Sequence, residues 1–327
     1  MTRIAWLVPI LALSAGFAVP TPGLAQDEVV TLAAYSTPRG VYEEVIPMFE
    51  ATEAGAGITF EESYSGSGDQ SRAVEAGLPA DVVALSLWPD VERLVAPGIV
   101  AADWDENEYG GMVSDSVVVF VVRPGNPKGI GGWEDLLRDD VDVITPNPFT
   151  SGGAQWNLLA AYGAQLAAGR SEDDAQAYLA QLIANTSVMD RSAREALTTF
   201  FAGQGDVLLS YENEAIFAQR AGQPVEYVLP SSTILIENPV AVTLTGDAPA
   251  AARAFVDYLY TPEAQGVFAE QGYRPVVPEV LASARYPVPE DLFTIADLGG
   301  WADVRPRFFD PDSGVVAEIF SELGRAQ

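Results

Sequence analysis

This chain of 327 residues lacks cysteine and histidine altogether. The missing cysteines exclude a disulfide framework, and the two absences together exclude any metal site ligated by cysteine or histidine. They also exclude catalytic pairs in which a histidine activates a serine or a cysteine. Lysine is nearly absent too, because Lys128 is the one lysine and the other basic residues are arginines. We expect neither a metal nor a cofactor.

Basic charge is scarce in the whole sequence. The chain has 17 Lys and Arg residues against 46 Asp and Glu residues, and its net charge is −29 at pH 7. Such an excess argues against nucleic acid and anionic membrane surfaces as partners. A small anionic ligand remains compatible with it, because exposed charges are screened over about 8 Å at physiological salt, whereas backbone amides in a closed cleft act at contact.

Long hydrophobic runs are confined to the first residues. Arg3 precedes an apolar stretch over 4–18, and Gly23-Leu24-Ala25 supplies small residues for cleavage. This pattern predicts a signal peptide over 1–25 and export to the periplasm. No later segment has 18 consecutive apolar residues, so we expect no membrane insertion of the mature chain.

The remaining chain alternates strand-like and helix-like segments, which is typical of an α/β protein with parallel-rich sheets. The segment 116–122 is apolar throughout, as in a strand that is buried on both faces. The chain is predicted to cross between two lobes near 114–115 and near 236–238. Lobe 1 is then 27–114 plus 239–327, with a C-terminal tail that can pack on both lobes, and lobe 2 is 115–238. Two crossings form a hinge, with a ligand in the cleft between the lobes.

The stretch Ser151-Gly152-Gly153 is the most informative of the sequence. It lies between an apolar strand-like run, 141–145, and a helix-like segment, 156–162, so it falls at a strand-to-helix junction. The first amides of a helix lack intrahelical partners, and the helix dipole makes that end positive. The two glycines let these amides approach a ligand, so the stretch predicts an anion site. The alternative is an ordinary turn that caps a helix.

Two further loops have related patterns. Ser67 lies between two glycines, in a small-residue loop before a short helix predicted over 71–76. Ser192 and Glu195 form a capping-box pattern, which places the amide of Ala193 in a first helical turn. The alternative for the second loop is helix initiation only.

Several segments match one family of proteins: 66–68 with Gln70 and Arg72, 123–129, 143–148, 150–157, 212–215 and 273–275. On these segments the chain resembles the periplasmic sulfate/thiosulfate-binding proteins of bacterial ABC importers, over nearly all of the mature sequence. The resemblance implies a two-lobed periplasmic binding protein fold of type II-like topology, with two parallel-rich sheets flanked by helices and two hinge crossings. It also implies a monomer that delivers sulfate or thiosulfate to a membrane ABC permease.

The same resemblance implies a set of neutral donors to the anion, which are Ser36, Ser67, Ser151, Gly152, Gly153, Ala193 and Tyr211. Within it, Ser151 donates its hydroxyl, and Gly152, Gly153 and Ala193 donate their amides. Ser36 stands where the family usually has an aspartate that contributes its backbone amide. Tyr211 stands where the family usually has a tryptophan that donates its indole N–H.

Two other functions remain open from the sequence. A binder of another oxyanion, molybdate or phosphate, can use the same fold. A carboxylate that faced the ligand would favour hydrogen phosphate, so Asp69, Glu212 and Glu214 matter, and we expect Asp69 to face away. A secreted hydrolase with Ser67 as nucleophile is disfavoured by the missing histidine, and we expect no enzyme.

Overall fold

The computed structural model describes residues 28–326, so the predicted signal peptide lies outside the described residues. The strands, in chain order, are β1 Glu28–Tyr35, β2 Ile58–Ser65, β3 Val82–Ala84, β4 Met112–Val122, β5 Val143–Ile144, β6 Thr186–Val188, β7 Val207–Tyr211, β8 Glu226–Val228, β9 Ser232–Val242, β10 Arg274–Pro275 and β11 Asp291–Phe293.

The helices are α1 Arg39–Glu50, α2 Ser67–Glu75, α3 Trp88–Glu92, α4 Gly152–Ala167, α5 Glu172–Ala184, α6 Ala193–Phe201, α7 Glu212–Arg220, α8 Pro249–Leu259, α9 Pro262–Glu270, α10 Pro278–Ser283, α11 Trp301–Phe309 and α12 Val315–Glu322, with 3₁₀ turns η1 Trp133–Leu137 and η2 Ile295–Leu298. Among the helices α1 to α12, none is long and apolar enough to cross a bilayer.

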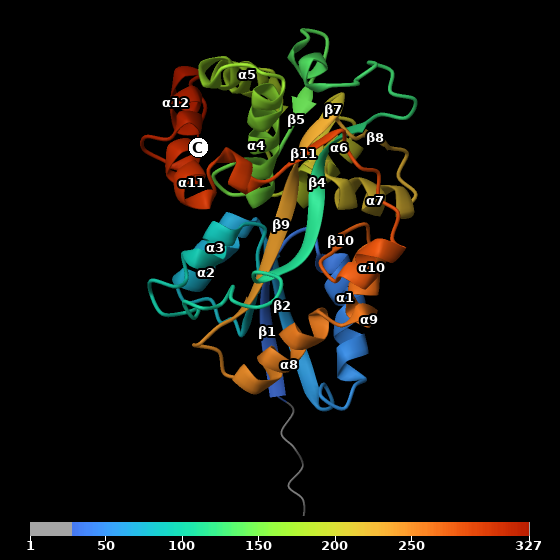
Figure 1. Cartoon of the computed structure of the whole chain (residues 1–327), viewed down its shortest axis with the longest axis vertical. Coiled ribbons are helices and arrows are strands. Elements are labelled where there is room, and N and C mark those ends of the chain that lie inside the picture. The colour runs from blue at the N-terminus through green and yellow to red at the C-terminus, as the bar shows by residue number, and fades with distance from the viewer. Residues whose placement is uncertain (1–27, 327) are drawn as a thin grey trace, which may run out of the picture.

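The strands form a mixed ladder in the order β2-β1-β3-β9-β4-β7-β5-β6. Its two ends are parallel, because β1 pairs in parallel with β2 and β3, and β5 with β6 and β7. The long strands β4 and β9 are antiparallel to each other and run through both halves of the molecule (Figure 1). Because these two strands pair with neighbours in both halves, the two parallel-rich ends are linked by continuous hydrogen bonding.

One half of the molecule surrounds β1, β2 and β3. Alternate residues of β1 face opposite sides of the sheet, so Val30 and Leu32 pack under α1, α8 and α9, whereas Ala33 packs under α2 and α3. The helices α1, α8 and α9 lie together on one side of this half (Figure 1). Both faces of this sheet are therefore covered by helices.

The other half surrounds β5, β6 and β7. Val118 and Phe120 of β4 pack toward α4 and α5, and Val117 and Val119 pack toward α6 and α7. This confirms the prediction that 116–122 is buried on both faces. Helix α4 is buried from Gly152 to Gln165, which is most of its length. This packing of the whole helix fixes the position of its first turn.

The C-terminal helices α11 and α12 pack against this second half. Phe308 of α11 and Phe320 of α12 belong to the same hydrophobic cluster as Trp156 of α4 and Leu179 of α5. The four helices lie side by side in Figure 1. The segment 301–322 thus contributes core to the half that contains 115–238.

The two predicted crossings lie opposite each other in the ladder. Ser114 pairs with Asn238, and Asp115 pairs with Glu237, where β4 and β9 pass from one half to the other. The assignment of the chain to two lobes stays a prediction.

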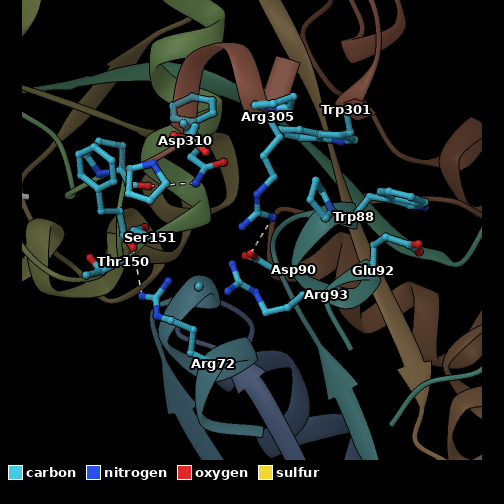
Figure 2. Close-up of a pocket in the computed structure, with 18 of the residues that line it drawn as sticks. Arg72, Trp88, Asp90, Glu92, Arg93, Thr150, Ser151, Trp301, Arg305 and Asp310 are labelled. Carbon is cyan, nitrogen blue, oxygen red and sulfur yellow. Dashed lines mark hydrogen bonds and ion pairs between the residues drawn. The ribbon is translucent and has the colours of Figure 1, made fainter. Parts of the chain in front are cut away.

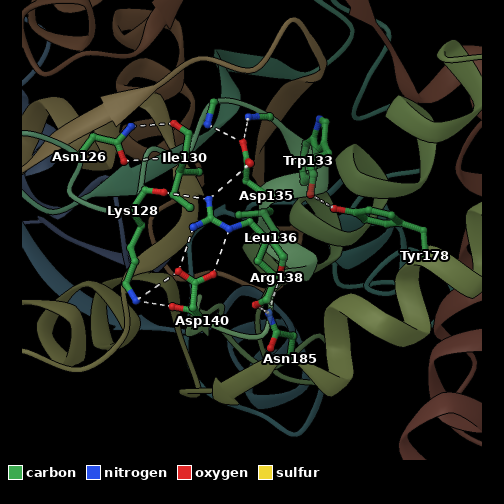
Figure 3. A network of polar contacts seen from close by, with 12 residues as sticks. Asn126, Lys128, Ile130, Trp133, Asp135, Leu136, Arg138, Asp140, Tyr178 and Asn185 are labelled. Carbon is green, nitrogen blue, oxygen red and sulfur yellow. Dashed lines mark hydrogen bonds and ion pairs between the residues drawn. The ribbon is translucent and has the colours of Figure 1, made fainter.

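A polar network holds the loop that follows β4 against α5 (Figure 3). Asn126 exchanges two hydrogen bonds with the backbone of Ile130, and Arg138 binds the Lys128 carbonyl oxygen and the Asp140 carboxylate. Asn185, at the end of α5, donates to the carbonyl oxygen of Leu136. These bonds satisfy backbone groups in a segment that has little regular structure.

One local prediction was wrong. Helix α2 begins at Ser67 and not at Ser71, so the small-residue loop contributes the first helical turn. Small polar residues have low helix propensity, and here tertiary packing outweighs it.

Candidate functional site

The first turn of α4 is held at the end of β5 by side chains of its own helix. Gln155 donates to the Pro148 carbonyl oxygen (2.9 Å), and Asn157 donates to Thr145 Oγ1 (2.9 Å). Ser151 occupies the N-cap position, but its hydroxyl makes no capping hydrogen bond and no other hydrogen bond within residues 28–326. Ser151 is only 3% exposed, so the residue is buried although its hydroxyl has no hydrogen-bond partner in the protein.

The predicted donors of the second half lie together around Gly153. The position that a Cβ would occupy at Gly153 is 3.4 Å from Ser151 Oγ, 3.4 Å from Tyr211 Cε1 and 3.5 Å from Ala193 Cβ. Ala193 is the first residue of α6, whose N-cap Ser192 accepts a hydrogen bond from the Glu195 amide (3.2 Å). Three segments far apart in sequence therefore meet at one point, and each of them is a helix N-terminus.

The first half contacts the second half beside this point, at Gly66. A Cβ at Gly66 would lie 2.5 Å from the Thr150 carbonyl oxygen and 2.8 Å from that of Arg191. The start of α2 therefore lies against the loops that precede α4 and α6, and only glycine fits there. Gly152 is similarly close to the first half, because its Cβ position is 2.7 Å from Ser86 Oγ.

Ser67 lies at this contact with its hydroxyl already bound. The Ser67 hydroxyl donates to Asp90 Oδ2 (2.7 Å) and accepts from the Ser86 amide (2.9 Å). Its amide is the first of α2 and has no acceptor among the described residues. The sequence reasoning missed Ser86 and Asp90, because neither stands in a motif.

Ser36 is half-buried at the end of β1, next to Thr37. The Thr37 carbonyl oxygen accepts a hydrogen bond from Arg194 Nη2 (3.0 Å), and its hydroxyl is 2.8 Å from Tyr273 Oη. Arg194 follows Ala193 in α6, so this bond links the residue after Ser36, in the first half, to the start of α6 near Gly153.

A family profile described as bacterial extracellular solute-binding protein matches residues 30–274. The chain belongs to this family.

Individual relatives agree with the family match. This solute-binding protein is 43% identical to the sulfate-binding protein of Synechococcus elongatus, over 88% of this chain and 85% of the relative. It is 36% identical to the thiosulfate-binding protein of Pseudomonas aeruginosa, over 94% of this chain and 97% of the relative. Among solved structures it is similar to the sulfate-binding protein SubI from Mycobacterium tuberculosis, with a TM-score of 0.84, 48% identity, and coverage of 86% of this chain and 100% of SubI. Its periplasmic binding protein fold is thus the predicted one.

Tyr211 of this solute-binding protein is 1% exposed and is the N-cap residue of α7. Its hydroxyl lies 2.6 Å from Ser86 Oγ in the other half, and either oxygen can be the donor. Burial raises the pKa of the Tyr211 phenol well above its usual value, so the hydroxyl keeps its proton at physiological pH. If Ser86 donates to Tyr211, the phenolic proton is free for a ligand.

The three acids singled out from the sequence are each bound to an arginine. Asp69 pairs with Arg72 (2.8 Å) and Arg191 (2.7 Å). The other two lie in buried pairs, Glu212 with Arg274 (2.9 Å) and Glu214 with Arg194 (2.7 Å). In each pair at least one carboxylate oxygen is occupied by a guanidinium group. Residues 28–326 contain no group of three or more acids that could hold a metal ion.

Proposed function

We propose that this protein captures sulfate or thiosulfate in the periplasm and delivers it to a membrane ABC permease. The family membership supports the role of a solute carrier, and the similarity to sulfate-binding and thiosulfate-binding relatives supports the two anions. We propose that it acts as a monomer and performs no reaction on its ligand.

One observation carries the proposal. The partnerless hydroxyl of Ser151 lies beside Gly153, Ala193 and Tyr211, where three helices begin. The Ser151 hydroxyl, the amides of Gly152, Gly153 and Ala193, and the Tyr211 phenol are the proposed donors of the second half. Ser36 and Ser67 contribute backbone amides from the first half, since the Ser67 hydroxyl proton is directed to Asp90.

This set of groups suits a fully ionised anion. Sulfate has no proton to donate near neutral pH, so a site made of donors alone satisfies it, and an accepting carboxylate would repel it. Hydrogen phosphate has such a proton and needs an acceptor. Because Asp69, Glu212 and Glu214 are bound by arginines, the site favours sulfate over phosphate.

The energy of such a site is sufficient. Hydrogen bonds to a charged group contribute about 1.5–3 kcal/mol each. Several of them, less the costs of desolvation and closure, leave the roughly 8 kcal/mol that micromolar affinity requires. No cationic side chain needs to touch the anion.

Isothermal titration calorimetry with sulfate, thiosulfate, phosphate and molybdate tests the proposal. We expect sulfate or thiosulfate to bind with a Kd of about 1 μM or lower, and phosphate and molybdate to bind far more weakly. Ser151→Asp should abolish binding while thermal unfolding stays cooperative, because a fixed negative charge takes the place of the anion.

Ser187→Asp is the matched control, since Ser187 is exposed on β6 and the charge change is the same. Tighter binding of molybdate or phosphate than of both sulfur oxyanions would transfer the function to the alternative ligands. Wild-type affinity in Ser151→Asp would contradict the assigned site.

A further inference from the structure

A cavity of about 860 Å³ opens beside the proposed anion site. It lies between α2 and α3 on one side and α11 on the other, and the loop before α4 forms its edge (Figure 2). Thr150 and Ser151 line this edge, so the cavity adjoins the proposed donors. Three arginines point into it, Arg72, Arg93 and Arg305, and we call it the arginine cavity (Figure 2).

The guanidinium groups of this cavity have more N–H donors than the neighbouring residues have acceptors for them. Arg93 makes no side-chain hydrogen bond within the described residues, its Nε is buried without a partner, and its nearest acid oxygen is on Glu75 at 3.9 Å. Arg305 makes one long bond, to Asp90 Oδ1 at 3.3 Å. Each guanidinium has five N–H donors, so most of those on Arg93 and Arg305 are unused.

The acids that line the cavity do not fill this deficit. Asp90 is 1% exposed and also accepts from Ser67, whereas Glu92 accepts from Trp104 at 3.4 Å. Asp310 accepts from the backbone and hydroxyl of Ser313. Burial, and then the positive charge of Arg305, lower the pKa of the Arg93 guanidinium, which is the direction expected where cations crowd together.

We propose that the arginine cavity is a second oxyanion site, a waiting position in which Arg93 and Arg305 hold a hydrated divalent oxyanion before it passes Ser151 into the closed site. Anion binding in the cavity stands on its own geometry, and the onward transfer rests on the proposed function. A planar guanidinium offers paired donors that match two oxygens of such an anion.

The waiting position answers a problem of charge. A protein with a net charge of −29 repels a dianion at long range, and the closed site uses uncharged donors that act only at contact. Three arginines and three acids, Asp90, Glu92 and Asp310, line the cavity, so its attraction is local. The unused guanidinium N–H groups of Arg93 and Arg305 attract an anion that has come within about a Debye length, which raises its association rate, and salt screens this effect. The arginines thus supply attraction without being buried against a dehydrated anion.

Stopped-flow kinetics with sulfate tests the transfer. Arg93→Gln should lower the association rate constant about threefold or more at about 10 mM ionic strength, and leave the dissociation rate constant unchanged. The difference should vanish at about 0.5 M salt. Arg253→Gln is the matched control, because Arg253 is exposed on α8 and the net charge changes equally. Equal association rates in the two variants, or a change in dissociation alone, would overturn the waiting role.

Iodide quenching of tryptophan fluorescence tests the cavity itself, even if no oxyanion binds at the closed site. Trp88 and Trp301 line the cavity, so iodide collected by the arginines should quench them. We expect quenching by iodide to fall in Arg93→Gln, with neutral acrylamide quenching unchanged, and Trp88→Phe to remove part of the Arg93-dependent signal. Identical iodide quenching in wild type, Arg93→Gln and Arg253→Gln would overturn the second site. A failed sulfate titration alone would instead remove only the proposed function.

Discussion

At the scale of single residues, the hydroxyl pair of Tyr211 and Ser86 joins the two halves directly. Tyr211→Phe keeps the buried ring but removes both this bond and the proposed donor to the anion, so we expect sulfate binding to weaken by about 1.5–3 kcal/mol, or roughly 12- to 160-fold. Ser86→Ala removes only the bond between the two hydroxyls and should cost less, about 0.5–1.5 kcal/mol, and the double variant should be little worse than Tyr211→Phe, because that bond is already lost there. Calorimetry measures the three affinities. Fully additive losses would mean that the two hydroxyls act separately.

Ser151 shows the cost of an N-cap hydroxyl that makes no hydrogen bond to its helix. Ser171, Ser192 and Thr261 each accept a hydrogen bond from an amide of the helix that they cap, but Ser151 does not. An N-cap bond is worth about 0.5–2 kcal/mol, so this protein forgoes that stability at α4. The hydroxyl and the first amides of α4 are left available, and the extensive burial of the helix offsets the missing cap.

At the scale of elements, the sequence predicted those whose pattern is local. The apolar run of β4 and the cap at Ser192 were visible because burial and capping leave a short-range signature. The start of α2 was missed, because its first residues, Ser67 and Gly68, are of types that also favour turns and loops.

Parts of the site were beyond sequence reasoning. Ser151, Gly152 and Gly153 could be proposed because a strand, two glycines and a helix follow one another. The bond between Arg305 and Asp90 joins residues 215 positions apart, so no local pattern announces it. The arginine cavity forms only where α11 packs beside α3, and these helices are too far apart in the sequence for a local pattern to predict it.

The strand β4 carries a titratable group whose ionisation should oppose folding. The pKa of Asp115 is raised from 3.8 to about 8, chiefly by burial and then by the nearby Glu237, against the opposite effect of Arg274. Because the folded chain keeps a proton that the unfolded chain loses near pH 4, stability falls as the pH rises toward 8. Asp115→Asn should therefore unfold at a higher temperature than wild type at pH 9, by about 2–4 °C per kcal/mol, and differ little near pH 4. Thermal melts at the two pH values decide this, and an equal difference at both would contradict the assigned cause.

At the scale of the whole molecule, two arginines on neighbouring turns hold the halves together in different ways. Arg191 is 72% exposed and pairs with Asp69, so Arg191→Gln should cost at most about 1 kcal/mol in stability or binding. Arg194 binds the fully buried Glu214 and the Thr37 carbonyl oxygen, so Arg194→Gln leaves a buried charge unpaired. We expect it to lower the free energy of unfolding by about 3–5 kcal/mol. Urea denaturation compares the two, and equal losses would contradict the difference in burial.

The two strands that join the halves are hydrogen-bonded to each other where they cross. A bend in β4 at Ser114 therefore has to be matched by a bend in β9 at Asn238, and neither strand can swing alone. For the two predicted lobes, such a double connection would confine relative motion to bending about one axis across these two pairs. The narrow gap between the carbonyl oxygens of Thr150 and Arg191, which leaves no room for a Cβ at Gly66, would then fix where the lobes make contact.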